Sequence, residues 1–472
     1  MKIQKSAGPL GWKKTFLWLV FIVICFQIAY TPIRFSAAGL VIFGFAYGLV
    51  RLTDQPNVRR AFYFGLAAGF LCYAPQLFFF WRIFNAASIV LWLVLAFWLG
   101  LFTSLACGCI LRWGKFKTVW LIPIIWTGLE YFRSELNYLK FSWLNIGYAL
   151  PPGCNLSRGG MYGAGFMILL AISVFYHRRF IFSRLKETSA RVTIWILVFF
   201  LAVAVVCLLL RSENRLLTGP EVKLVGIQME FPSENIIPKM LNNALAKNTD
   251  AAIFVLSEYT LDGQVPDSLK SWCREHSRYL VIGGKDCITN DLYYNTAFVV
   301  GTNGEVIFKQ AKSVPIQFFH DGLPAPTQNI WNSPWGKIGI GICYDLSYTR
   351  VTDELVRQGA QLLIVPTMDV DEWGRHQHEL HSRVAPVRAA EYGIPIFRVA
   401  SSGISQAVSE NGYVVRQTSI PGNGEIFSAQ LRLPPCGSLP WDRFLTPFCV
   451  GATGIIMAAL LILAWNDKRS VK

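Results

Sequence analysis

The sequence is poor in charged residues. Asp, Glu, Lys and Arg together make up 15% of its 472 residues, whereas soluble globular proteins carry about 25%. Hydrophobic residues make up 53%. This composition excludes a disordered chain, a collagen-like chain and a soluble enzyme of this length, and it indicates a membrane protein.

Metal-binding and disulfide patterns are also lacking. The 11 cysteines include no CxxC pair and no ligand spacing typical of zinc. Pairing of Cys273 with Cys287 stays open, because it depends on an oxidising compartment. His376, His378 and His381 stand in the order HxHELH rather than HExxH. The sequence therefore predicts neither a metal site nor a cofactor.

The net charge of +15 is unevenly distributed along the chain. Residues 212–442 hold 19 Lys and Arg against 24 Asp and Glu, while the rest of the chain holds 25 basic and 5 acidic residues. Basic residues at the ends of apolar segments set membrane topology. We therefore predict membrane lipid, and no nucleic acid, as a partner.

Apolar runs long enough to cross a bilayer predict about eight membrane spans. They lie at 15–33, 36–50, 61–81, 86–111, 118–132, 160–176, 192–210 and 444–465. The first run lacks a small-residue cleavage site and is expected to be a span rather than a cleaved signal. Loops on the side of the N-terminus hold 18 basic residues and the opposite short loops hold five, which predicts that both termini are cytoplasmic.

Three regions follow from these runs. We expect a membrane bundle of about seven spans in residues 1–211, an extracytoplasmic domain in 212–443, and a final span with a cytoplasmic tail in 444–472. In the middle region, apolar runs such as AIFVLSE and LLIVPTMD alternate with stretches of helical character. Buried strands that alternate with helices are typical of a layered α/β fold.

Two of these apolar strands end in a reactive side chain, and a third reactive residue follows a glycine-led run. AIFVLSE ends at Glu258, KIGIGIC ends at Cys343, and Lys312 stands eight residues after Gly304. Open α/β sheets place their sites at the carboxyl ends of strands. Cys343 suits a nucleophile, Glu258 a proton acceptor and Lys312 an oxyanion stabiliser. Singly, Cys343 is equally a core residue and the other two an ion pair; a cysteine–histidine dyad ranks below the Glu–Lys arrangement.

The domain resembles the nitrilase, or carbon–nitrogen hydrolase, superfamily. The stretch ICYDLSYTRVTDELVRQGAQLLIVPTMD is similar to the nucleophile strand, helix and next strand of that superfamily. The resemblance implies an αββα sandwich with the catalytic triad Glu258, Lys312 and Cys343, and its glycine-to-lysine spacing selects Lys312 over Lys309. It also implies supporting roles for Tyr344 and Asp345, where Asp345 replaces the usual glutamate.

The membrane half narrows the resemblance to the apolipoprotein N-acyltransferase family. Stretches such as IIWTGLEYFRSEL, FSWLNIGYAL and WGRHQHELHSRVAPVRAAE are similar to that family. The resemblance implies that an acyl chain moves from a phospholipid, expected to be phosphatidylethanolamine, through a cysteine thioester to the diacylglyceryl-cysteine of an apolipoprotein. It further implies a multi-pass protein of the bacterial inner membrane with its catalytic domain on the periplasmic side.

The loop after the lysine departs from the family pattern. KSVPIQFFHDG is two residues shorter than expected and lacks the family's second glutamate, for which Gln317 and Asp321 are the candidate substitutes. Two alternatives therefore stay open. One is a membrane-tethered amidase that uses water as acceptor, although tethering needs a single span. The other is a catalytically inactive lipoprotein-binding relative, which the intact Glu258, Lys312 and Cys343 argue against.

Overall fold

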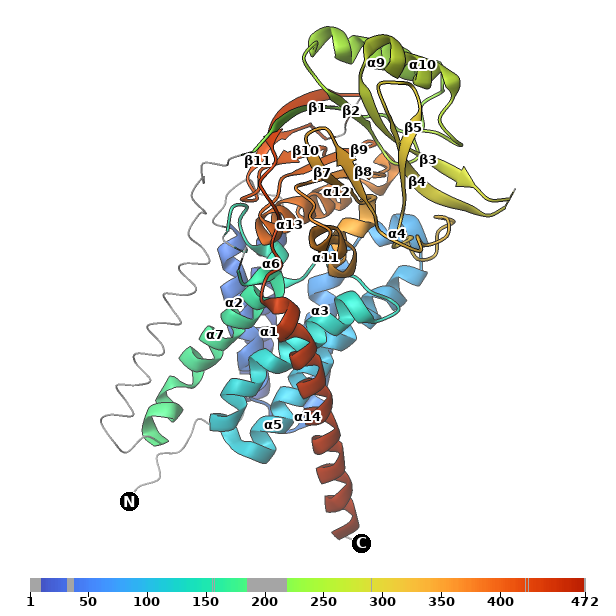
Figure 1. The fold of residues 1–472 in the computed structure, drawn as a ribbon. Helices are drawn as coiled ribbons and strands as arrows, with labels where there is room; N and C mark the ends of the chain where they lie inside the picture. Colours follow the sequence, from blue (N-terminus) through green and yellow to red (C-terminus); the bar gives the residue numbers. More distant parts are fainter. Residues whose placement is uncertain are drawn as a thin grey trace. The chain divides into compact units, whose positions relative to one another are not determined.

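The computed structural model forms two compact units (Figure 1). It describes residues 10–31, 38–154, 156, 158–184, 219–289, 291–420, 422 and 424–470. The helical unit takes residues from 1–151, 159–210 and 441–472, and the α/β unit takes residues from 152–158 and 211–440. The predicted span at 192–210 lies outside the described residues.

The described part of the helical unit contains four helical segments that are long and apolar enough to cross a membrane. They belong to α1, α5, α7 and α14, and shorter helices lie between them. The bounds are α1 Trp12–Tyr30, α2 Ile42–Leu52, α3 Val58–Gln76, α4 Phe79–Phe84, α5 Ala87–Tyr131, α6 Ile146–Ala149, α7 Gly160–Arg184 and α14 Asp442–Ser470. The predicted total of about eight spans stays a prediction.

Three of the expected spans take a different form. The runs 86–111 and 118–132 both fall within α5, where Gly114 has a φ of +78° and interrupts the helical geometry. The run 36–50 contributes to α2, which has 11 residues. At about 1.5 Å per residue, that helix is shorter than a bilayer core of about 30 Å.

Small residues allow α3 to approach α5 closely. A Cβ at Gly65 would stand 2.7 Å from the carbonyl oxygen of Leu99, and one at Gly69 would stand 2.7 Å from the Cα of Ala96. The two glycines are four residues apart and share one helix face. This small-xxx-small arrangement is typical of membrane helices, whose association depends on close backbone packing.

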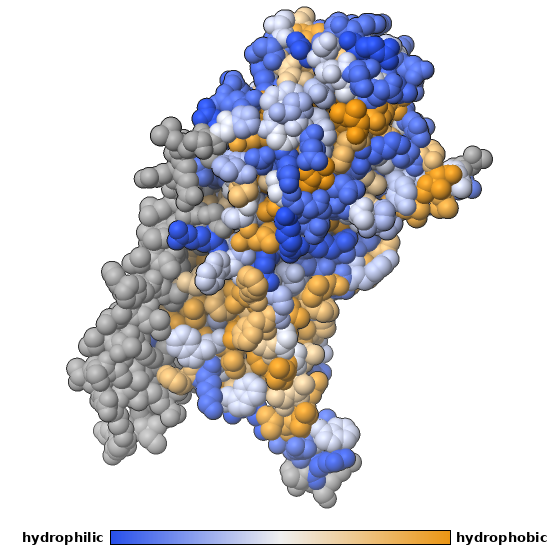
Figure 2. Space-filling view, in the orientation of Figure 1, coloured by the Kyte–Doolittle hydropathy of each residue, from blue (hydrophilic) through white to orange (hydrophobic). Residues whose placement is uncertain are grey.

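The surface of the helical unit is apolar. On α14, Phe444 is 84% exposed, Ile455 73% and Leu461 64%. Figure 2 shows hydrophobic residues gathered over this unit, whereas hydrophilic residues predominate on the visible face of the α/β unit. Contiguous exposed apolar surface of this kind indicates contact with lipid rather than with water.

Buried polar groups hold the segment that follows α5. The guanidinium of Arg133 donates to the hydroxyl of Tyr73 at 3.1 Å and to the side-chain oxygen of Asn145. The carboxylate of Glu130 accepts from the backbone N–H of Ile146 at 3.0 Å. Because ionisable groups are costly inside a membrane unless they are paired, these contacts fix the 130–146 segment within the bundle.

The α/β unit contains two six-stranded sheets in the described residues. The first has the order β12-β1-β2-β3-β4-β5 and the second the order β11-β10-β9-β8-β7-β6. Strands β1 to β3 run parallel in the first sheet, as do β7 to β9 in the second. The bounds are β1 Glu221–Ile227, β2 Ile253–Leu256, β3 Tyr279–Cys287, β4 Tyr293–Val300, β5 Val306–Ala311, β6 Ile330–Ser333, β7 Gly336–Ile340, β8 Leu362–Thr367, β9 Ile396–Ala400, β10 Gln406–Val408, β11 Val414–Gln417 and β12 Ile426–Arg432.

Helices cover the outer faces of the two sheets (Figure 1). The first sheet carries α9 (Ile236–Lys247) and α10 (Asp267–His276), and the second carries α11 (Thr349–Arg357), α12 (Arg375–Ser382) and α13 (Val384–Tyr392). Trp272 of α10 packs on Phe254 of β2 with ring centroids 5.2 Å apart. Between the sheets, Phe397 stacks on Phe427 at 4.9 Å. The predicted α/β sandwich is confirmed.

The cysteines that the sequence left open are free thiols. Cys273 is buried in α10, and Cys287 is exposed at the end of β3.

Candidate active site

The three reactive residues predicted from the sequence all follow strands of the α/β unit. Glu258 lies two residues after β2, Lys312 directly after β5, and Cys343 at the start of a short 3-10 turn that follows β7. All three are at most 2% exposed. The structure joins Glu258 and Lys312 in an ion pair of 2.8 Å.

A second carboxylate lies against the lysine. The ammonium of Lys312 is 2.7 Å from Oδ2 of Asp321, so Asp321 fills the place beside the lysine for which the sequence offered two candidates. The side-chain amide of Asn295 donates to Oε1 of Glu258 at 2.6 Å and to Oδ1 of Asp321 at 2.8 Å. One ammonium and one amide therefore bridge two buried carboxylates.

Backbone and phenol donors fix Asp321 in this position. Its Oδ2 accepts from the N–H of Ile316 at 2.7 Å, and its Oδ1 accepts from the hydroxyl of Tyr259 at 2.9 Å. These bonds close the irregular loop after β5 around the end of Lys312.

Cys343 sits on a strained backbone. Its φ is +51°, in the left-handed region, which costs a non-glycine residue about 1–2 kcal/mol. Its sulfur lies 3.7 Å from the carbonyl oxygen of Met368, and the N–H of Met368 donates to Oε2 of Glu258 at 2.7 Å. Residue 368 therefore contacts both the thiol and the carboxylate. Strain of this kind persists only where surrounding contacts hold it, and it is concentrated at functional sites.

Asp345 ties the cysteine turn to the segment that follows Lys312. Its buried carboxylate accepts from the N–H groups of Ile342 at 3.1 Å, Ser313 at 3.0 Å and Val314 at 2.7 Å. Burial raises the pKa of Asp345 to about 6, while Lys312 and these N–H groups act in the opposite direction. The shorter aspartate thus reaches both segments.

Arg388 of α13 holds the far end of the same turn. The guanidinium is fully buried and donates to the carbonyl oxygens of Leu346 at 3.0 Å and Ser347 at 2.8 Å. Tyr344 packs edge-on against Tyr348, with ring centroids 4.9 Å apart. The predicted supporting residues Tyr344 and Asp345 both lie within this braced turn.

Burial sets the proton affinities of the site. It raises the pKa of Glu258, against the lowering effect of Lys312. For Lys312, burial acts to lower the pKa, but Asp321 and Glu258 outweigh it and hold the pKa well above its usual value. Burial and then the charge of Glu258 raise the pKa of Cys343. A thiol whose pKa is raised in this way is protonated near neutral pH.

A separate cluster of charged side chains surrounds Asp369, the residue that follows Met368. The carboxylate of Asp369 contacts Nδ1 of His381 at 2.7 Å and the guanidinium of Arg398, and it accepts from the amide of Gln377 at 3.0 Å. Burial alone would raise the pKa of Asp369, but His381 and Arg398 hold it well below its usual range. His381 is thus bonded to Asp369.

Among the described residues, no group of three or more His, Cys, Asp or Glu is arranged to hold a metal ion.

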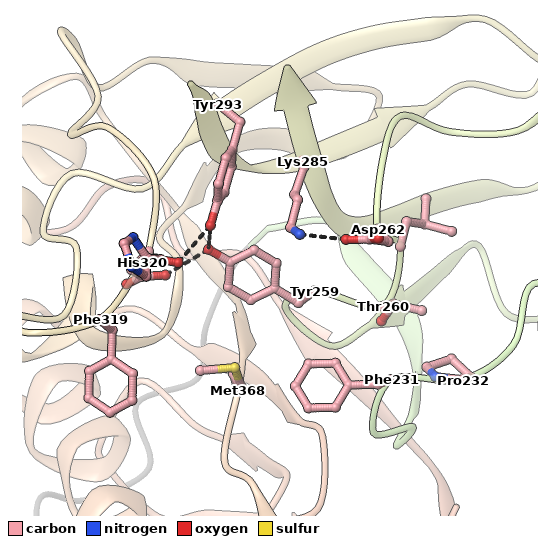
Figure 3. A pocket seen from close by; sticks show the side chains of 12 residues that line it. Phe231, Pro232, Tyr259, Thr260, Asp262, Lys285, Tyr293, Phe319, His320 and Met368 are labelled. Atoms are coloured by element: carbon pink, nitrogen blue, oxygen red, sulfur yellow. Dashed lines mark hydrogen bonds and ion pairs between the residues drawn. The ribbon is translucent and has the colours of Figure 1, made fainter. Parts of the chain in front are cut away.

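A cavity of about 470 Å³ borders the site (Figure 3). Asp321, Tyr259 and Met368 line it and also contact the buried charges. Phe231 and Phe319 contribute aromatic surface to the same cavity. A molecule in this cavity would therefore lie next to residues that contact Glu258 and Lys312.

Two residues of the site were not predicted from the sequence. Asn295 is one inward-facing residue on β4, and Met368 acts through its backbone, so neither carries a recognisable signal. Glu258 and Cys343 were found because each ends an apolar strand run.

Comparison with known proteins gives two family matches. Residues 201–440 match the model of carbon-nitrogen hydrolases, and residues 22–174 match that of the apolipoprotein N-acyltransferase N-terminal domain. An apolipoprotein N-acyltransferase of Nitrosomonas europaea is 22% identical over 81% of this chain and 83% of its own length. One from Shewanella oneidensis is 24% identical over 85% of this chain and 88% of its own length. The structure of Nit3 from Saccharomyces cerevisiae, a member of the nitrilase superfamily, covers 47% of this chain and 93% of its own, at 20% identity and a TM-score of 0.39.

The two matches together define a membrane enzyme that carries a nitrilase-like domain. The chain belongs to the carbon-nitrogen hydrolase family, in its apolipoprotein N-acyltransferase branch.

Proposed function

We propose that this enzyme transfers an acyl chain from a phospholipid to the N-terminal amine of a diacylated lipoprotein, with Glu258, Lys312 and Cys343 as catalytic triad. The observation that carries the assignment of the triad is the buried Glu258–Lys312 ion pair, whose carboxylate is held by the same residue that contacts the Cys343 sulfur. The N-acyltransferase activity itself accords with the family matches over both halves of the chain.

In the first half-reaction, the sulfur of Cys343 attacks the carbonyl carbon of the phospholipid ester while Glu258 takes the thiol proton. Lys312 stabilises the oxyanion that forms; two of its three N–H groups bind Glu258 and Asp321, and we assign the third to the oxyanion. Collapse of this tetrahedral intermediate breaks the ester bond. The departing alkoxide takes the proton from Glu258 and leaves as a lysophospholipid, and the acyl group stays on sulfur as a thioester.

In the second half-reaction, the α-amine of the lipoprotein's diacylglyceryl-cysteine attacks the thioester carbon. Glu258 accepts a proton from the amine, Lys312 again stabilises the oxyanion, and the C–S bond breaks. The proton returns from Glu258 to the sulfur, so the enzyme is restored and an amide is formed. Asp321 acts as a positioning residue, because it holds Lys312 charged and in place.

Phosphatidylethanolamine is the proposed donor, and the proposed location is the bacterial inner membrane. Residues 212–443 form the periplasmic catalytic domain in this proposal, with both termini in the cytoplasm. The unequal distribution of basic residues between the two sets of loops supports this orientation. A bundle of spans suits the reaction because both substrates are anchored in the bilayer.

The amidase alternative is not favoured. An amidase that is only tethered would need one span, whereas residues 22–174 match a dedicated N-acyltransferase N-terminal domain. The other alternative, a catalytically inactive lipoprotein-binding relative, is not favoured either, because it gives the buried charges of the site no role.

The direct test uses purified full-length enzyme, phosphatidylethanolamine and a synthetic diacylated lipopeptide. We expect a product whose mass increases by one acyl group, with the new group placed on the α-amine by fragmentation. The Glu258→Gln and Cys343→Ala variants should give no product. Release of free fatty acid without any N-acylated peptide would refute the transferase and favour the hydrolase.

A further inference from the structure

We propose that Lys285 and Asp262 bind the zwitterionic headgroup of the donor phospholipid, with the phosphate on Lys285 and the ammonium on Asp262. Both side chains line the cavity beside the active site. This inference rests on the proposed acyl transfer and names the feature by which the enzyme selects its donor.

The backbone places the two side chains next to each other. The segment after Glu258 runs along β3: the N–H of Leu261 donates to the carbonyl of Gly283 at 3.0 Å, and the N–H of Lys285 donates to that of Gly263 at 3.1 Å. A Cβ at Gly283 would stand 2.6 Å from the Cα of Glu258. Glycine at 283 therefore allows close contact, and the proposed headgroup site lies on the same two segments as the catalytic carboxylate.

The two charges form an ion pair that a ligand can open at low cost. Lys285 and Asp262 are paired, with their side chains 31% and 91% exposed. Exposed pairs contribute little to stability, so little is lost when they exchange partners. A zwitterion offers an anion for the lysine and a cation for the aspartate at the same time.

Among the described residues that line the cavity, Lys285 is the only lysine or arginine. Its ammonium lies 5.2 Å from the ring centroid of Tyr293, which keeps it over the cavity. The hydroxyl of Tyr293 donates to the carbonyl of His320 at 2.6 Å, and that of Tyr259 donates to Asp321. Because both phenols have acceptors, Lys285 is the group that is suited to a phosphate.

The cavity has two chemically different sides (Figure 3). Lys285 and Asp262 lie together on one side, while Phe231, Phe319 and Met368 gather on the other. Met368 contacts both Cys343 and Glu258. A phospholipid with its headgroup at Lys285 and Asp262 would thus have its glycerol ester directed toward Met368 and its hydrocarbon against the aromatic side chains.

The test measures the rate of thioester formation on purified full-length enzyme in detergent micelles that contain either phosphatidylethanolamine or phosphatidylglycerol. The second lipid keeps the phosphate and lacks the ammonium. For Lys285→Gln we expect a KM about tenfold higher with both lipids, because a charge-assisted contact to the phosphate is lost. For Asp262→Asn we expect a higher KM for phosphatidylethanolamine alone. The ratio of the KM values for the two lipids should therefore move toward one.

Matched controls come from the neighbouring ion pair between Lys309 and Asp286, which does not line the cavity. Lys309→Gln and Asp286→Asn should leave both KM values unchanged. A p-nitrophenyl ester, which carries no phosphate, should load all variants at the wild-type rate and so report an intact catalytic site.

Unchanged KM values in both cavity variants, or an unchanged lipid preference in Asp262→Asn, would overturn the headgroup assignment while leaving acyl transfer in place. Failure of the wild-type enzyme to load from any phospholipid, with the p-nitrophenyl ester still accepted, would overturn the proposed function itself.

Discussion

The ammonium of Lys312 lies 2.7 Å from the carboxylate of Asp321, and both side chains are at most 3% exposed. Glu258 binds the same ammonium at 2.8 Å. The two carboxylates keep the lysine protonated. Burial, and then the charge of Asp321, raise the pKa of Glu258 against the lowering effect of Lys312. These are the properties that an oxyanion stabiliser and a general base require.

Replacing Asp321 with Asn should shift the pH profile of thioester formation. Glu258 must be ionised to act, so activity appears as the pH rises through its pKa. The charge of Asp321 raises that pKa, and its removal should move the acidic limb to lower pH. We also expect a rate about tenfold lower at the optimum, because a charge-assisted bond to Lys312 is lost. An acidic limb at the wild-type position would contradict the role given to Asp321.

Replacing Lys312 with Met should affect both rate and stability. Loss of an oxyanion donor costs about 10²–10³ in rate, and two buried carboxylates left without their cation destabilise the fold by about 3–5 kcal/mol. A second substitution, Glu258→Gln, should restore much of the thermal stability and none of the activity. If the double variant melts no higher than the single one, the paired charges do not account for the loss.

Replacing Asp345 with Asn should loosen the turn that carries Cys343. The amide cannot accept all of the backbone N–H bonds that end at this carboxylate, and each buried donor left unsatisfied costs about 1–3 kcal/mol. We expect a lower melting temperature together with slower thioester formation. Glu354→Gln on the exposed face of α11 serves as the control and should leave both unchanged.

Replacing Gly65 with Leu should disturb the helical unit. The added side chain meets the backbone of α5, where even a Cβ has no room, and overpacking costs about 1–3 kcal/mol. We expect a lower melting temperature in detergent. Gly454→Ala on α14 adds a methyl group where the space around it is open, and it should behave as wild type.

The sequence predicted the structure best where a strand is buried along its whole length. Uninterrupted apolar runs predicted the central strands, and the residues that end two of them, Glu258 and Cys343, lie at the site. Lys312 was selected through the family spacing. Asp321 could not be chosen over Gln317, because the loop between β5 and β6 has no periodicity and its path depends on the bonds that it makes to Lys312 and Tyr259.

The helical unit was harder to predict in detail. Hydropathy gave the apolar runs, but it did not show that 86–111 and 118–132 would join within α5 at Gly114. It also did not show how Arg133 and Asn145 would meet inside the bundle, because partners in a membrane depend on helix packing rather than on local sequence.

The central claim is tested most directly by intact mass spectrometry of the full-length enzyme after incubation with phosphatidylethanolamine. The account predicts one added acyl mass on the wild-type chain, none on Cys343→Ala, and loss of the adduct when a diacylated lipopeptide is supplied. An adduct that persists in Cys343→Ala, or that water removes and the lipopeptide does not, would contradict acyl transfer through this cysteine.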